Sequence, residues 1–456
     1  MVRASLPVFM LWIIGATALT LLCADLRRWT LPAKIGLSFG FGLVILTITL
    51  FILSLCGVKP TPWLGLAEAI CLLGIVIATR RDSLRYWLPQ EGDREARKRL
   101  SIWEGTLFAF VIGIFFVVSA ASSLEPIVEW DVIAIWALKA KVLLHEPMNS
   151  SPYFSDVSRA YSHLDYPLLW PFAMAWVWTC IGDTDLVKVK LLAPALLASL
   201  FLLFFGLLRR KQSRAHALFF TAVLAGTPML LTQASRMMTD VPLAFFTLGA
   251  FVCSYLWLES KHPDDLRIAA IFAVGMLFTK NEGIGLWFIL GIIVVIAIAA
   301  ERGIKFLLPA GIWLGVAPVL VTLPWFIFRF GIPKVHEDYG SKINPVYFLN
   351  NIARVREVLG SSLRFFLNWD DWLIFWPLAL LLLILTPTHS LRRPLVFLFL
   401  GAALPLLMYG YIYVVAPWNL GELMEVTANR LLLQIAPLWA FLFAEQVRAR
   451  RLLPFN

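Results

Sequence analysis

Long apolar runs separated by short polar stretches follow one another along the whole chain. Runs such as Lys34–Cys56 and Leu307–Phe328 are long enough to cross a bilayer, because a transmembrane helix needs about 20 mostly apolar residues. The longer polar stretches, among them Ser122–Asp165 and Arg329–Asp371, leave no room for a separate soluble domain. This pattern predicts an all-α polytopic membrane protein.

The composition agrees with a membrane protein. Of the 456 residues, 60% are hydrophobic and 15% are charged, and the mean hydropathy is +0.79, whereas soluble domains carry about 25% charged residues. The net charge of +10 does not indicate nucleic-acid binding, because the Lys and Arg residues lie in short clusters between apolar runs, as in cytoplasmic loops. The five Cys residues lack metal-ligand spacing. Met1–Cys23 has no small-residue cleavage site, so we interpret it as an uncleaved first span.

The basic clusters predict which loops face the cytoplasm. They are Arg27-Arg28 with Lys34, Arg80 to Arg99, Arg209-Arg210-Lys211 with Arg214, Arg302 with Lys305, Arg392-Arg393, and Arg448 to Arg451. If all of them are cytoplasmic, residues 122–165 lie outside and an odd number of crossings must lead back to Arg209. Two apolar segments intervene, so one of them does not cross. Tyr166–Ile181 is short and rich in Pro and Trp, and we expect it to form an interfacial or re-entrant helix on the outer face.

This scheme gives about 13 transmembrane helices, plus interfacial helices in the first large outer loop, and an N-terminus outside. The outer segments are residues 122–165, Leu231–Asp240, Thr279–Gly283, Arg329–Asp371 and Pro417–Arg430. We divide the chain into additional N-terminal spans (1–100), a core with the outer loop 122–165 (101–330), and an outer loop with C-terminal spans (331–456).

The first outer loop carries a carboxylate with two interpretations. Asp131 precedes the apolar segment Val132–Leu144, which is too short to span and is expected to lie in the membrane interface. A carboxylate is favourable at a helix N-terminus, so Asp131 could simply cap this helix. Lys139 would lie about 12 Å further along the axis, at ~1.5 Å per residue. Asp131 is therefore not neutralised locally and is a candidate base.

Other charged residues of the outer segments also have alternative interpretations. Arg236 and Asp240 are four residues apart, so a structural ion pair is as plausible as a functional role. Lys280 and Glu282 interrupt an apolar hairpin and could form a solvated turn or part of a site. His336 could act as an acid, a base or a metal ligand, although a solvated loop is the commoner case for such a residue.

Several short motifs occur in a characteristic order. An outer-face Asp131 opens an interfacial helix, and Asp165-Tyr166-Pro167-Leu168-Leu169-Trp170-Pro171 begins a Trp-rich segment. Met238–Phe246 and Met276–Gly283 follow, and a span ends at Leu323-Pro324-Trp325. From Trp103 to Phe330 this order resembles the polyprenyl-phosphate-sugar-dependent glycosyltransferases of the GT-C fold class. The likeness is greatest to the lipid A aminoarabinose transferases and protein O-mannosyltransferases.

The resemblance implies roles for individual residues. Asp131 matches the catalytic base of the first outer loop, and Asp240 matches a second acidic residue of the active site. Asp165 and Tyr166 match a segment near the donor phosphate, and Lys280 matches the lysine of a Thr-Lys-Gly motif.

The sequence also departs from the family pattern. Val132 replaces the second acid of the usual Asp-Glu pair, which leaves Glu129 as the near acidic neighbour. Tyr166-Pro167-Leu168 has one proline where two are common, and Asn281 stands where glycine is usual. These departures from the family pattern concern the substrate more than the fold.

The resemblance implies an integral membrane glycosyltransferase. Its partners would be a polyprenyl-phosphate-linked sugar donor, a lipid, glycan or protein acceptor, and the bilayer. One carboxylate can deprotonate the acceptor hydroxyl, and a single displacement inverts the anomeric carbon. Lys280, Arg236 or Lys139 could balance the departing phosphate. No cofactor is certain, although Asp131 and Asp240 could hold a divalent metal. The expected location is the inner (plasma) membrane, with the active site facing the periplasm or exterior.

Two other functions stay open. A transporter or flippase of lipid-linked sugars would place charges along a transport path, but the candidate charges lie at one face and no internal repeat is visible. An O-antigen ligase or polymerase-type enzyme would use Arg and His residues of a large outer loop, which Arg329–Asp371 could supply. A structural scaffold would leave the outer charges without a role.

Overall fold

The structure is a computed structural model that describes residues 2–88, 99–301, 303–333, 342–385 and 394–450. Within these ranges the secondary structure is helical, as the sequence predicts, and no strand occurs. The N-terminal half contains α1 (Val2–Leu22), α2 (Leu31–Leu55), α3 (Pro62–Arg80), α4 (Ile102–Leu124), α5 (Leu138–His145), α6 (Leu169–Ile181), α7 (Leu192–Leu208), α8 (Arg214–Ala225) and α9 (Pro228–Ser235).

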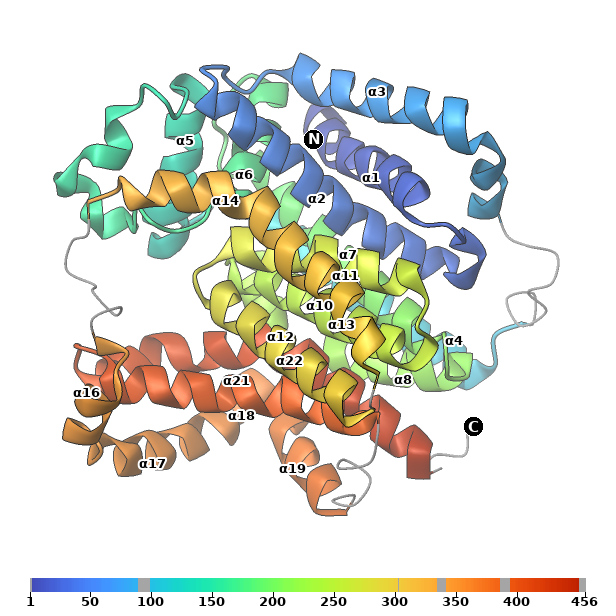
Figure 1. The fold of residues 1–456 in the computed structure, drawn as a ribbon, viewed down its shortest axis with the longest axis vertical. Helices are drawn as coiled ribbons and strands as arrows, with labels where there is room; N and C mark the ends of the chain where they lie inside the picture. Colours follow the sequence, from blue (N-terminus) through green and yellow to red (C-terminus); the bar gives the residue numbers. More distant parts are fainter. Residues whose placement is uncertain (1, 89–98, 302, 334–341, 386–393, 451–456) are drawn as a thin grey trace.

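The C-terminal half continues the same architecture (Figure 1). It contains α10 (Asp240–Ser260), α11 (Pro263–Thr279), α12 (Glu282–Ala300), α13 (Leu307–Ala310), α14 (Ala317–Phe330), α16 (Pro345–Asn350), α17 (Arg354–Phe366), α18 (Trp369–Trp372), α19 (Phe375–Leu385), α21 (Leu395–Val415) and α22 (Leu420–Arg450). Two π-helical turns, Val132–Ala137 before α5 and Gly311–Val316 before α14, interrupt the regular helices.

The expected number of spans is not confirmed. In the described residues ten helices are long and apolar enough to cross a membrane, or eleven if the bent pair α8–α9 counts as one span. The pattern of apolar runs in the sequence predicts about thirteen spans. Helix α11 has 17 residues and α19 has 11, so both are shorter than the roughly 20 residues that a full span needs.

The helices pack closely around α10, which other helices surround over its apolar length. Helix α10 contacts α11 and α22, and α2 lies between α1 and α7. Close approach of α1 and α2 depends on Gly42, because an added Cβ would lie 1.8 Å from the carbonyl oxygen of Leu11. Such close backbone contact at a small residue is characteristic of helix pairs in membranes, where dispersion contacts must hold the helices together.

Helix α6 differs from the sequence-based expectation. Its Trp-rich face was expected to lie at the outer membrane surface, but Trp170, Trp176 and Trp178 are at most 1% exposed. Each indole N–H donates to a backbone carbonyl of another segment, namely Met237, Pro7 and Asp185. The indoles therefore have their polar partners inside the protein, and α6 is a short core helix. Of the two expected forms the interfacial one is wrong, and the re-entrant one stays a prediction.

The ion pairs form two groups, and each group joins segments expected on the same side of the membrane. The group of the outer segments includes Arg236–Glu129, Arg329–Asp165, Lys280–Asp240, Lys280–Glu282, Arg364–Glu425, Arg430–Asp131 and Arg430–Asp240. The group of the basic loops includes Arg28–Asp265, Arg210–Asp265, Arg214–Glu104, Lys211–Glu259 and Lys261–Glu301. In Figure 1, α5 and α16 lie at the left of the molecule and the end of α22 lies at the right. The chain thus has two polar ends separated by apolar helices.

Candidate active site

The centre of the site is Arg430, which lies between two of the predicted acidic residues. Its Nη1 lies 2.7 Å from Oδ2 of Asp131, and its Nε lies 3.0 Å from Oδ2 of Asp240. These side chains come from three distant parts of the sequence: the first outer loop, the start of α10 and the middle of α22. The structure therefore brings together two carboxylates that the sequence analysis assigned to one site, and joins them through an arginine that it did not assign.

Asp240 is the most enclosed member of this network. It is completely buried, and its Oδ1 accepts hydrogen bonds from Lys280 Nζ at 2.9 Å and from Gln434 Nε2 at 2.7 Å. Lys280 Nζ also lies 2.8 Å from Oε1 of Glu282. Burial disfavours the charged form of Lys280, but Asp240 and Glu282 outweigh this effect and raise the pKa of Lys280 above its ordinary value. The solvated-turn interpretation of Lys280 and Glu282 is therefore wrong.

The local backbone directs Asp131 toward the helical core. Asp131 precedes the π-helical turn Val132–Ala137, and its side chain makes no capping hydrogen bond. A π turn carries an extra residue per turn and is frequent at functional sites. Buried Val132 and Trp136 attach this turn to the core, and the carboxylate of Asp131 contacts Arg430 instead of its own helix. The helix-cap interpretation of Asp131 is therefore wrong. The cation that pairs with Asp131 comes from α22 and not from its own helix, which agrees with the expectation that Asp131 is not neutralised locally.

Arg236 and Asp240 do not form the ion pair that their spacing suggests. Arg236 ends α9, and Met237 after it has a left-handed backbone with φ of 61°. This turn separates the two side chains, and Arg236 Nε lies 3.1 Å from Oε1 of Glu129. Glu129 and Arg236 therefore form a more exposed ion pair beside the Arg430 network.

A second cluster lies around Asp165. Its Oδ2 accepts hydrogen bonds from Arg329 Nη2 at 2.7 Å and from Asn281 Nδ2 at 3.2 Å. Because Asn281 lies between Lys280 and Glu282 in the sequence, this cluster adjoins the Arg430 network. Neither Arg329 nor Asn281 was among the site residues predicted from the sequence.

Lys139 and Tyr166 lie together beside this second cluster. Lys139 is buried, donates to the backbone carbonyl of His163, and lies 5.6 Å from the ring centroid of Tyr166. Trp136 contributes a second ring, whose centroid is 5.5 Å from Lys139 Nζ. Burial lowers the pKa of Lys139 to about 7, although the charge of Asp165 opposes this shift.

The residues do not fit the divalent metal considered for Asp131 and Asp240. The guanidinium of Arg430 occupies the space between the two carboxylates and supplies the positive charge there. In the described part of the chain, no three His, Cys, Asp or Glu side chains are grouped as metal ligands. His336 lies outside the described residues.

Part of the chain is similar to a known protein family. Residues 151–337 match the family model of dolichyl-phosphate-mannose-protein mannosyltransferases. The resemblance to the protein O-mannosyltransferase branch of the GT-C class is thereby confirmed, and the match supports a membrane glycosyltransferase. The matched segment, residues 151–337, contains Asp165, Asp240, Lys280 and Arg329, whereas Asp131 and Arg430 lie outside it.

Two solved structures are similar to the chain at a lower level. The crystal structure of ArnT from Cupriavidus metallidurans in the apo state has 16% sequence identity and a TM-score of 0.48, over 76% of this chain and 59% of that chain. The structure of ArnT from the same organism bound to undecaprenyl phosphate has 16% identity and a TM-score of 0.46, over 76% and 60% of the two chains. This chain thus spans about three fifths of the ArnT chain. No curated protein matches the sequence significantly.

In addition to Arg329 and Asn281 within residues 151–337, sequence reasoning missed three polar residues outside this matched segment. They are Arg430 and Gln434 of α22 and Asp371 of α18, which accepts a hydrogen bond from Asn429. A signal for Arg430 was present, because an ionisable residue within a long apolar helix usually has a functional or buried partner. Gln434 and Asp371 had no comparable signal, since their partners depend on how α22 packs against α10 and α18.

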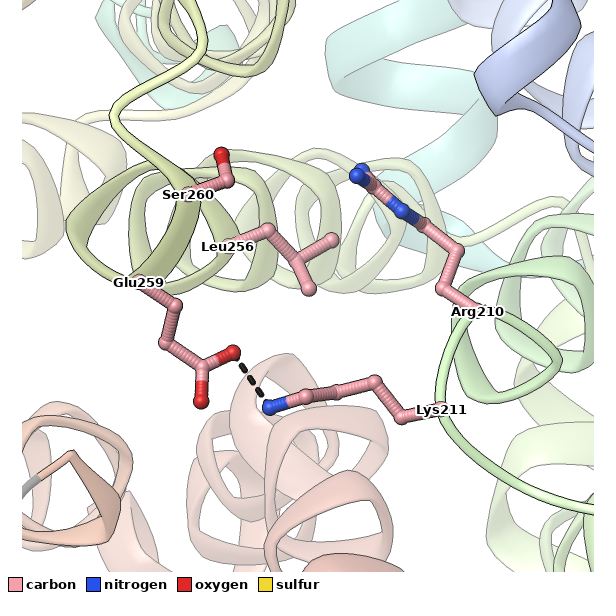
Figure 2. A pocket seen from close by; sticks show the side chains of 5 residues that line it. All are labelled: Arg210, Lys211, Leu256, Glu259 and Ser260. Carbon is pink, nitrogen blue, oxygen red and sulfur yellow. Dashed lines mark hydrogen bonds and ion pairs between the residues drawn. The ribbon is translucent and has the colours of Figure 1, made fainter.

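A pocket lies at the other polar end of the protein, among the basic loops (Figure 2). Arg210, Lys211, Leu256, Glu259 and Ser260 line it. Its two cations are already paired, Arg210 with Asp265 and Lys211 with Glu259. The pocket belongs to the ion pairs of the basic loops, and we do not assign it to the active site.

Proposed function

We propose that the protein transfers a sugar from a polyprenyl-phosphate donor to an acceptor hydroxyl on the outer face of the inner (plasma) membrane. Asp131 is the general base, and the reaction inverts the anomeric carbon. The observation that carries this proposal is the contact of Asp131 and Asp240 with one arginine, beside Lys280 of the matched segment. A base, a second carboxylate and two cations are the groups that such a transfer needs.

The proposed step is a single displacement. The acceptor oxygen attacks the anomeric carbon from the face opposite the phosphate, and its proton passes to the carboxylate of Asp131. The bond between the anomeric carbon and the phosphate oxygen breaks, and its electron pair leaves with the phosphate. Because the phosphate is a good leaving group, no acid has to protonate it, and the positive charges of Lys280 and Arg430 stabilise the charge that develops on it.

Unpaired polar atoms beside the network support a polyhydroxyl ligand. Thr239 Oγ1, Asn281 Oδ1 and Glu282 Oε2 are buried and have no hydrogen-bond partner among the described residues. Buried polar atoms are usually paired, and the hydroxyl groups of a sugar are suitable partners for all three. Asp240 and Lys280 lie between these atoms in the sequence and in the network, so the proposed sugar lies next to the proposed phosphate contacts.

The test is sugar transfer by the purified protein in detergent with a panel of radiolabelled polyprenyl-phosphate sugars. Wild type should consume one donor, and Asp131→Asn should bind that donor but turn it over about 10²–10⁴ times more slowly, as expected for loss of a general base. Asp156→Asn is the matched control, because Asp156 is an exposed carboxylate of the same outer loop that pairs with Arg159. Full activity of Asp131→Asn would refute the base assignment. Failure of wild type with every donor would favour a transporter or ligase.

A further inference from the structure

The two carboxylates that Arg430 joins are held very differently. Asp240 is completely buried and has three partners, which are Arg430, Lys280 and Gln434. The Asp131 side chain is 27% exposed, and in the described part of the chain Arg430 is the one side chain that hydrogen-bonds it. Asp240 is therefore the fixed partner of Arg430, and Asp131 is the partner that can be exchanged.

The charges of the network restrict how an anion can enter it. Asp131, Asp240 and Glu282 carry three formal negative charges, and Arg430 and Lys280 carry two positive ones. A phosphate that joined this network without replacing a carboxylate would add to an existing excess of negative charge in a buried site, which is strongly unfavourable. Entry of a phosphate is favourable only if one carboxylate gives up its cation.

Exchange of partners at Arg430 would let the phosphate bind and would also free the carboxylate of Asp131. A guanidinium has five N–H donors in a planar fork that matches phosphate oxygens, and Arg430 uses Nε for Asp240 and Nη1 for Asp131. Replacement of Asp131 by phosphate would therefore anchor the donor and free the Asp131 carboxylate from its hydrogen bond to Arg430 in one event.

We propose that the donor phosphate displaces Asp131 from Arg430, so that donor binding itself releases the catalytic base. This inference rests on the proposed function, in which Asp131 is the base and the donor is a polyprenyl phosphate. Arg430 keeps its contact with Asp240 throughout, and this contact fixes the direction of its guanidinium. Before donor binding, Asp131 is held by Arg430 and the acceptor hydroxyl is not activated.

The test is equilibrium binding of polyprenyl phosphate, without a sugar, to the purified protein in detergent. Asp131→Asn should bind it about tenfold more tightly than wild type, because the neutral amide competes less well than the carboxylate for the charged guanidinium of Arg430. Arg430→Gln should bind it at least about tenfold more weakly, because this variant lacks the charged guanidinium that would bind the phosphate. In the Arg430→Gln background, Asp131→Asn should have no further effect.

Controls separate exchange from general electrostatics. Asp156→Asn removes a negative charge from the same outer loop without touching Arg430, and it should leave binding unchanged. Polyprenol, which lacks the phosphate, should bind equally to wild type and Asp131→Asn. If Asp131→Asn binds polyprenyl phosphate no more tightly than wild type, or binds polyprenol more tightly to the same extent, the exchange is refuted. The Asp131→Asn arm decides the question even if Arg430→Gln does not fold.

The binding assay also distinguishes this inference from the proposed reaction. Tighter binding by Asp131→Asn without sugar transfer from any donor would support phosphate exchange and refute the transferase assignment. Sugar transfer that depends on Asp131, with no change in polyprenyl-phosphate affinity in Asp131→Asn, would support the transferase assignment and refute the exchange.

Discussion

The Nζ of Lys280 lies 2.9 Å from Oδ1 of Asp240, and the two side chains are 5% and 0% exposed. Lys280 follows α11 directly, and Asp240 is the first residue of α10. The ion pair thus fixes the ends of two adjacent helices at the polar end that carries the candidate site. It also supplies the charge that lets Asp240 stay ionised away from solvent.

Substitution of Lys280 should therefore destabilise the protein strongly. Lys280→Met removes the cation that Asp240 and Glu282 share. Loss of one partner from a buried ion pair lowers the free energy of unfolding by about 3–5 kcal/mol. Lys261→Met is the matched control, because the Lys261–Glu301 pair is more exposed and surface pairs contribute about 1 kcal/mol or less. Thermal unfolding in detergent measures both. Equal shifts for the two variants would contradict the buried character of the Lys280 pair.

The lowered pKa of Lys139 predicts a pH dependence of stability. Its pKa is about 7 in the folded protein, compared with an ordinary value of 10.5. Between these values the unfolded chain binds a proton that the folded chain does not, so the contribution of Lys139 to stability rises as the pH increases from about 7 toward 10.5. Lys139→Met should remove this rise. Unfolding temperatures of both proteins at pH 6 and pH 9 test it, and parallel changes in the two would show that Lys139 is not responsible.

The sequence predicted the membrane class, the helical architecture and the grouping of the outer segments, because these depend on local hydrophobicity and on the placement of basic residues. The basic clusters and the parity of the crossings together placed Asp131, Asp240 and Lys280 at one end, and their contacts agree with this placement. Membrane orientation itself stays a prediction, since the contacts group the segments without placing a bilayer around them.

The errors arose where tertiary contacts override local patterns. Trp residues favour membrane interfaces, but Trp170, Trp176 and Trp178 of α6 are enclosed by neighbouring helices. Similarly, the four-residue spacing of Arg236 and Asp240 suggested an ion pair, but the turn at Met237 breaks the helix on which that spacing depends. Both features require knowledge of the helix packing, which one sequence does not contain.

Activity should not depend on a divalent metal. Arg430 occupies the position between Asp131 and Asp240 that a shared ion would need, and it supplies the positive charge that the ion would contribute. Transfer by the wild-type protein with its preferred donor should therefore be unchanged after treatment with EDTA. Loss of transfer that Mg²⁺ or Mn²⁺ restores would show that the carboxylates bind a metal after a rearrangement of Arg430.

Packing of α3 against α6 can be tested with two glycines of the same helix. A Cβ at Gly65 would lie 2.3 Å from the ring of Trp176, whereas a Cβ at Gly74 meets no atom within 4 Å. Gly65→Val should lower the free energy of unfolding by about 1–3 kcal/mol, as overpacking does, and Gly74→Val should change it little. Thermal unfolding of the two variants compares them. Equal stability would mean that α3 does not rest on Trp176.

Both ends of α6 lie at the same polar end of the protein, and this sets the topology of the spans that follow. Ile127 N–H donates to the carbonyl of Leu186, and Lys190 Nζ donates to the carbonyl of Glu125, so the segment after α6 contacts the first outer loop. Both ends of α6 therefore belong to one polar end, and its 13 residues are too few for a span of about 20. In intact cells, a membrane-impermeant maleimide should label Asp183→Cys and Ser155→Cys from outside.

The control for this labelling is Glu301→Cys, which lies among the basic loops and should react only after the membrane is opened. The native Cys56 and Cys71 are exposed and must be replaced by Ser in the background protein. Labelling of Asp183→Cys only from the cytoplasm would mean that α6 crosses the membrane. In that case the spans after α6 would have the opposite orientation. Lys280 and Arg430 would then lie on the cytoplasmic side.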